Sequence, residues 1–218
     1  MGPESLQLHR LVQAILRDRP ISTGRRSAKF LIRRLRARLR TGPVSTPATE
    51  GDMSTVVRRL LREAVPAEPW NNPASWPAWR QLLPHVLAIT NVTPTTDSGG
   101  VSWLLDRAAI YLQTQGEPRP ARVLFERAHQ LCRDRLGEDH PDTLSSASNL
   151  ALDLHALGEY HQARTLNEDT LTRSRQVLGE DHPLTLGSAS NLAMDLRALG
   201  EDQQAGALEE WIKRQRGA

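Results

Sequence analysis

Apolar residues recur at helical spacing through the second half of the chain. The stretch NLALDLHALG has apolar residues at positions i, i+1, i+4 and i+7, the period of one face of an α-helix: Leu150, Ala151, Leu154 and Leu157. Gly158 follows, and glycine commonly ends a helix because it adopts a left-handed backbone conformation without a steric clash. The apolar period then resumes at Tyr160, Ala163, Leu166 and Leu171. These residues predict two amphipathic helices joined by a tight turn.

The same pattern occurs again 42 residues later in the chain. Residues 136–164 and 178–206 are identical at 22 of 29 aligned positions. Each copy opens with GEDHP, and in the first copy Asp139 and Pro141 are residue types that commonly begin a helix, as a cap and in the first turn. We therefore expect Asp139 to cap the first helix of its unit.

A more divergent copy precedes these two by the same interval. Gly116 aligns with Gly158 and Gly200, at the predicted turn of each unit. An isolated helical hairpin cannot bury its apolar face, whereas stacked hairpins bury one another's, and about three units are needed for stability. The sequence therefore predicts an all-α fold, a solenoid of three helical hairpins.

This repeat resembles a known family of helical repeats. Its small alanine, its helix-ending glycine and the aromatic residue two positions later are similar to the tetratricopeptide repeat. The 42-residue period with LGEDHP resembles the longer variant found in kinesin light chains. The resemblance covers residues 101–206. Asp202 and Gly206 depart from it, because they replace Tyr160 and Arg164 of the previous copy, so the last helix is less firmly specified.

In tetratricopeptide stacks, the first helices of successive repeats line a concave groove that binds peptides. The resemblance places four residues of each repeat in this groove: Asp106, Arg107, Ile110 and Gln113; Ser148, Asn149, Leu152 and His155; and Ser190, Asn191, Met194 and Arg197. It implies that Asn149 and Asn191 hydrogen-bond an extended peptide, since a side-chain amide both donates and accepts. The alternative is that both are helix-surface residues satisfied locally. Arg107 stands where the other repeats have Asn, so that end of the groove is expected to favour an acidic group.

Two segments before the repeats resemble parts of a larger signalling protein. SLQLHRLVQAILRDR is similar to the end of the winged-helix region in STAND or NB-ARC NTPases, where a His-x-Leu element lies near nucleotide; here it would be His9 and Leu11. WPAWRQLLPHVLAI is similar to the spacer before the repeats in bacterial proteins of this kind. The phosphate-binding motif G-x-x-x-x-G-K-S/T is absent. The resemblance therefore implies the C-terminal sensor part of such a regulator. The two alternatives are a separately encoded NTPase as partner and a longer NTPase of which this chain is a fragment.

The predicted organisation has four parts. Glycine, proline, serine and threonine accumulate in the second part, which favours a linker. Trp70, Trp76 and Trp79 are expected to hold the proline-rich spacer against neighbouring helices. The parts are an N-terminal helical segment at 1–40, the linker at 41–54, a helical spacer at 55–100 and the three repeats at 101–218.

Charge is unevenly distributed along the chain. Residues 1–62 hold 14 Lys and Arg against 4 Asp and Glu, whereas residues 63–218 hold 14 against 21. A helical pattern at residues 25–40 carries a basic patch of Arg33, Arg34, Arg36, Arg38 and Arg40. Such a helix can attract nucleic acid or an anionic membrane surface. The alternative is a helix that packs its leucine face on the protein and leaves the arginines in solvent.

The sequence predicts no catalytic, metal or cofactor site. The pairs Asp139–His140 and Asp181–His182 recur beside a proline, where a helix start accounts for the acid. No stretch approaches the ~18 apolar residues of a transmembrane helix, and the single cysteine, Cys132, fits a reducing cytoplasm. We therefore predict a non-catalytic, cytoplasmic module with a protein or peptide partner. The alternative is a nucleic-acid or anionic-membrane adaptor that uses residues 25–40.

Overall fold

The computed structural model describes residues 50–70, 72–91 and 98–217. Within these ranges the chain forms α-helices, one short 3-10 helix and no strand, which confirms the all-α prediction. The elements are α3 (Glu50–Ala64), η1 (Pro73–Ser75), α4 (Trp76–Asn91), α5 (Ser98–Thr114), α6 (Pro118–Leu136), α7 (Pro141–Ala156), α8 (Tyr160–Leu178), α9 (Pro183–Ala198) and α10 (Asp202–Gly217). The chain divides into two compact units, residues 1–60 and 61–218.

Several predicted features lie outside the described residues. These are the N-terminal segment at 1–40, with His9, Leu11 and the basic patch, and most of the predicted linker at 41–54. Helix α3 begins at Glu50 and therefore includes the last five residues of that linker.

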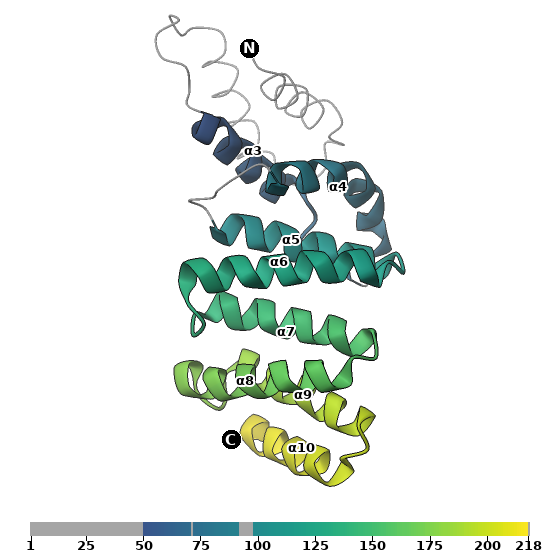
Figure 1. The fold of residues 1–218 in the computed structure, drawn as a ribbon, viewed down its shortest axis with the longest axis vertical. Helices are drawn as coiled ribbons and strands as arrows, with labels where there is room; N and C mark the ends of the chain where they lie inside the picture. The colour runs from purple at the N-terminus through teal and green to yellow at the C-terminus, as the bar shows by residue number, and fades with distance from the viewer. Residues whose placement is uncertain (1–49, 71, 92–97, 218) are drawn as a thin grey trace, which may run out of the picture. The chain divides into compact units, whose positions relative to one another are not determined.

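Three hairpins make up residues 98–217 of the second unit, as the 42-residue period predicts. The hairpins α5–α6, α7–α8 and α9–α10 stack in chain order, and Figure 1 shows the six helices following one another along the unit. The first helix of each hairpin is followed by a glycine with positive φ: 76° at Gly116, 79° at Gly158 and 79° at Gly200. Residues with a Cβ rarely adopt this conformation, so glycine is needed at each turn.

Alanines fill the contact between the two helices of each hairpin. Ala151 on α7 is fully buried, and so are the second-helix alanines Ala121, Ala163 and Ala205. Small side chains at these positions let the two helix backbones approach, and larger apolar residues surround them. The third hairpin, for example, has a core of Leu186, Leu192, Leu196 and Ile212.

The start of each repeat differs from the prediction in one detail. The prediction that Asp139 caps α7 is wrong, because His140 is the N-cap and its Nδ1 accepts a hydrogen bond from the Asp142 backbone N–H at 3.1 Å. In the next repeat His182 accepts from the Leu184 N–H, also at 3.1 Å. Asp139 instead forms an ion pair with Arg173 at 2.7 Å. The residue after the histidine is proline, which has no backbone N–H. The N–H of the residue after that proline is therefore the one that donates to the histidine ring.

The spacer packs against the first hairpin through Trp79. Its indole N–H donates to the Pro66 carbonyl at 3.2 Å, and its ring stacks on Tyr111 of α5 with centroids 5.6 Å apart. Trp76 likewise donates to the Pro69 carbonyl at 3.1 Å. Trp70, by contrast, is largely exposed and does not play the predicted role. Two of the three tryptophans therefore hold the proline-rich segment in place.

Candidate functional site

The twelve predicted groove residues lie on α5, α7 and α9, which are the first helices of the three hairpins. Helix α7 contacts both α5 and α9, so the three helices are neighbours. Because the repeat is 42 residues long, equivalent positions on them form rows across the stack. The rows differ in how exposed their side chains are and in whether those side chains have partners within the protein. Only the rows that are exposed are available to a ligand.

One row is apolar and reaches the surface. It consists of Ile110, Leu152 and Met194, which are partly buried, 40% exposed and 46% exposed, respectively. Leu152 and Met194 are two of the five large apolar side chains that are exposed in the described part of the chain. Apolar side chains exposed in register on adjacent helices favour contact with a partner.

The adjacent row is polar and consists of Arg107, Asn149 and Asn191, all partly exposed. The Asn149 side chain hydrogen-bonds the Asp106 carboxylate, so it is tied to the first repeat. Arg107 lies over the Trp103 ring, with its guanidinium carbon 5.7 Å from the ring centroid. We call these six side chains the recognition surface: Arg107, Ile110, Asn149, Leu152, Asn191 and Met194.

Asp106 is an ionisable group at the first-repeat end of this surface. Burial raises the pKa of its carboxyl to about 7, and the charge of Arg107 and the hydrogen bond from Asn149 offset only part of that effect. Its Oδ1 is buried without a hydrogen-bond partner. A carboxyl with this pKa changes charge near neutral pH, which alters the local charge at this end of the surface.

Another predicted row connects successive repeats. The Gln113 amide donates to Asp153 Oδ1 at 2.7 Å, and His155 Nδ1 lies 2.7 Å from Asp195 Oδ1. Arg197, at the equivalent position of the third repeat, forms two hydrogen bonds with Glu209 of α10 at 2.9 and 2.8 Å. These three side chains therefore have partners within the stack.

The predicted serines are also engaged within the protein. Ser148 is buried, and its Oγ lies 3.1 Å from Ser188 Oγ on the neighbouring first helix. Ser190 Oγ donates to the Leu186 carbonyl at 2.9 Å. Both hydroxyls therefore have hydrogen-bond partners within the protein, so these serines can stand at packed positions of the first helices.

Asp153 and Asp195 are buried carboxylates that sequence reasoning missed. Both are fully buried, and both accept from the repeat before them. Asp195 Oδ2 also accepts from the Asn167 amide at 2.7 Å, whereas Asp153 Oδ2 has no partner. An acid between two apolar residues, in LDL and MDL, was the available signal.

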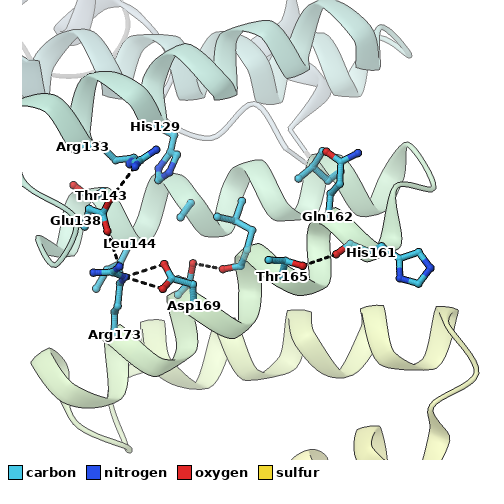
Figure 2. Close-up of a pocket in the computed structure, with 14 residues that line it drawn as sticks. His129, Arg133, Glu138, Thr143, Leu144, His161, Gln162, Thr165, Asp169 and Arg173 are labelled. Atoms are coloured by element: carbon cyan, nitrogen blue, oxygen red, sulfur yellow. Dashed lines mark hydrogen bonds and ion pairs between the residues drawn. The ribbon is translucent and has the colours of Figure 1, made fainter.

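A pocket of about 600 Å³ lies between the second helices α6 and α8, over α7. Leu144, Ala147 and Leu154 of α7 and Leu166 of α8 contribute apolar lining. Figure 2 shows its polar residues in two groups, with Arg133, Glu138 and Arg173 at one end and His161 and Gln162 at the other. Sequence reasoning missed this α6–α8 pocket, since its lining comes from three helices and a loop.

Two kinds of site have no support in the described residues. No group of three or more His, Cys, Asp or Glu side chains there is placed to hold a metal ion. Over the same residues, every helix is too short or too polar to cross a bilayer.

Comparison with protein families identifies the repeats. The tetratricopeptide repeat model matches residues 101–175 and again residues 142–212, which together span just over half of the chain. The chain belongs to the tetratricopeptide repeat family. No curated protein matches its sequence. Tetratricopeptide repeats generally act as protein-interaction scaffolds and are typically non-catalytic.

Solved structures show the same fold. A kinesin light chain-type protein of Podosopora anserina with nearly identical tetratricopeptide-like repeats has a TM-score of 0.54 and 19% identity, and the match covers 98% of this chain and 90% of that one. A single-substitution variant of that protein gives a TM-score of 0.55 with the same identity and coverage. This similarity supports the predicted relation to kinesin light chain repeats at the level of fold.

Proposed function

We propose that this tetratricopeptide repeat protein binds an extended peptide segment of a partner protein on its recognition surface. It acts without catalysis, as the sensor or scaffold part of a STAND-type signalling regulator in the cytoplasm. The resemblance of the N-terminal and spacer segments to such regulators supports this role, and an NTPase of that kind is the component that the resemblance implies it works with.

The pair Leu152 and Met194 is the observation that carries this proposal. They are among the most exposed apolar side chains described, and they stand one repeat apart beside Asn149 and Asn191. Packed helices lie about 8–10 Å apart, and an extended peptide advances roughly 3.3 Å per residue. Two or three peptide residues would therefore bridge the two apolar side chains, while the asparagine amides reach the peptide backbone.

The test compares the introduction of a negative charge on two faces of the stack. Partners are first captured from lysate with the full chain, identified, and titrated as purified proteins by calorimetry. The double variant Leu152→Glu with Met194→Glu should weaken the chosen partner by roughly a hundredfold, since two apolar contacts become buried charges. Val177→Glu on α8, at a side chain that is also exposed, is the matched control and should leave affinity unchanged.

A second experiment separates this proposal from the adaptor alternative. The charge excess of residues 1–62 favours that alternative, and binding of nucleic acid through arginines weakens steeply with salt because counterions are released. Peptide binding through apolar contacts should change little between low and moderate salt. If deletion of residues 25–40 abolishes binding while the Leu152 and Met194 variants retain it, the recognition surface is not the binding site.

A further inference from the structure

Two junctions between second helices can be compared within this one chain. Helices α6 and α8 both pack against α7, and helices α8 and α10 both pack against α9. The apolar floor is the same in both, because Leu144, Ala147, Leu154 and Leu166 correspond, 42 residues on, to Leu186, Ala189, Leu196 and Leu208. Differences between the junctions therefore come from the side chains that cover this floor.

Three apolar residues cover the floor of the α8–α10 junction. Leu171 and Ile212 belong to the buried core there, and Trp211 packs against it. The guanidinium of Arg175 lies 4.1 Å from the centroid of the Trp211 ring. A cation at this distance from an indole face is attracted by the ring electrons. In the α8–α10 junction, the Trp211 indole therefore lies between the apolar floor and Arg175.

The α6–α8 junction has polar residues at the same three positions. His129, Asp169 and Thr170 stand where the next junction has Leu171, Trp211 and Ile212. Asp169 and Thr170 are smaller than the residues they correspond to, and Asp169 turns to Arg173, which it contacts at 2.8 Å. The apolar floor on α7 is the same as in the next junction, but the large apolar side chains that cover it there are absent here. This difference explains why the pocket lies between α6 and α8. Arg133 stands where Arg175 covers the indole.

The charged end of the pocket, around Arg133, Glu138 and Arg173, has one more carboxylate than guanidinium groups when Asp139 is counted, which pairs with Arg173 but does not line the pocket. Arg133 pairs with Glu138 at 2.8 Å, and Arg173 pairs with Glu138, Asp139 and Asp169 at 2.5, 2.7 and 2.8 Å. This cluster has three carboxylates for two guanidinium groups. His129 does not restore the balance, because burial lowers its pKa and keeps the ring neutral at physiological pH. A positively charged group beside the ligand is therefore favoured.

We propose that the α6–α8 pocket binds an aromatic side chain, best an indole, that a partner polypeptide presents next to a basic residue. The aromatic ring takes the place that Trp211 has in the next junction, on the floor formed by Leu144, Ala147 and Leu154. Arg133 covers the ring as Arg175 covers Trp211, and the adjacent basic residue meets the three carboxylates. This site lies between two second helices over α7 and includes none of the six side chains of the recognition surface.

The probe for this proposal is the peptide acetyl-Lys-Trp-Lys-amide, titrated into the isotope-labelled full chain and followed by NMR. Saturable shifts at His129, Leu144 and Asp169 are expected, with NOEs from the probe's indole protons to the methyl groups of Leu144 and Ala147. Acetyl-Lys-Ala-Lys-amide should bind at least roughly tenfold more weakly, and so should acetyl-Glu-Trp-Glu-amide. Equal affinity of the alanine peptide, or NOEs to Leu152 instead of Leu144, would overturn the proposal.

A variant that fills the pocket from within provides a second test. His129→Leu, Asp169→Trp and Thr170→Ile together rebuild the covering of the α8–α10 junction, so the probe should lose at least roughly tenfold in affinity. The melting temperature should rise, because apolar surface becomes covered. Unchanged probe affinity in a folded triple variant would contradict the proposal. If the variant does not fold, the NOEs of the wild-type chain decide alone.

Discussion

At the scale of single residues, identical local sequence does not give identical environments. Asp153 and Asp195 occupy the same position of consecutive repeats, yet Asp195 has two hydrogen-bond partners and Asp153 has one. The cause lies on the preceding second helix, where Asn167 donates to Asp195, whereas the equivalent residue 42 positions earlier is Phe125, whose side chain has no hydrogen-bond donor. Burial raises the pKa of Asp153, and the hydrogen bond from Gln113 opposes this only in part.

Replacing each aspartate by asparagine should therefore have opposite consequences. Asp195→Asn should destabilise the protein by about 1.5–3 kcal/mol, the usual range for losing hydrogen bonds to a charged group. Asp153→Asn should leave the melting temperature at pH 7.5 unchanged or raise it, because it removes an incompletely paired buried charge. Thermal unfolding followed by circular dichroism distinguishes the two. Equal losses in both variants would mean that the second partner of Asp195 contributes nothing.

Asp106 should make stability fall as pH rises toward neutrality. Its pKa is raised from 3.8 to about 7, so between these values the folded state holds a proton that the unfolded state has released. Stability from this group is fully present below pH about 4 and decreases until pH about 7. Asp106→Asn removes the titration, so its melting temperature relative to wild type should be higher at pH 8 than at pH 5. A difference that stays constant with pH would contradict a raised pKa.

At the scale of elements, the two helices of each hairpin are held together by small residues. Ala151 of α7 is fully buried, whereas Ala156 at the end of the same helix is exposed. The fold thus offers two alanines with the same helix propensity and opposite burial, so a comparison between them isolates the effect of packing.

Arginine at these two positions should therefore have very different effects. Ala151→Arg places an unpaired charge where α7 meets its neighbours, which should cost several kcal/mol and unfold the second hairpin. Ala156→Arg should stay within about 0.5 kcal/mol of wild type, as is usual for surface substitutions. Denaturant titrations of both variants measure the free energies of unfolding, and similar values would mean that Ala151 is not at a packed contact.

At the scale of the whole molecule, the repeats can be assigned more firmly than the part before them. The family match covers residues 101–175 and 142–212, and the structural neighbours share the stacked-hairpin fold. The proposed link to STAND regulators rests on short N-terminal and spacer resemblances, and these 218 residues contain no phosphate-binding motif. Nucleotide binding tests this link directly.

The full chain should not bind ATP. Its two lysines, Lys29 and Lys213, have neither a preceding glycine nor a following serine or threonine, so neither belongs to a phosphate-binding loop. Calorimetric titration of Mg-ATP into the full chain should give only the heat of dilution. A P-loop ATPase measured under the same conditions is the positive control. Saturable heat from this chain would show that it carries a nucleotide site of another kind.

The sequence by itself determined the repeat, its length and the helices within it. Apolar spacing, turn glycines and proline at helix starts are local signals, so they can be interpreted without knowing which segments meet. They also placed Leu152 and Met194 together on one face, because a period of 42 residues puts equivalent positions on neighbouring helices. The precise cap was not predictable in this way, since Asp139 and His140 both have side chains that can accept a hydrogen bond.

Only the tertiary structure decided which polar side chains are already engaged and where a cavity remains. His155 and Ser148 were candidates for ligand binding until their partners Asp195 and Ser188, 40 residues away, were placed beside them. The α6–α8 pocket likewise depends on Asp169 standing where the next junction has Trp211. Hydrogen bonds and cavities are properties of neighbouring surfaces, so they are fixed when the hairpins stack and cannot be deduced from one helix alone.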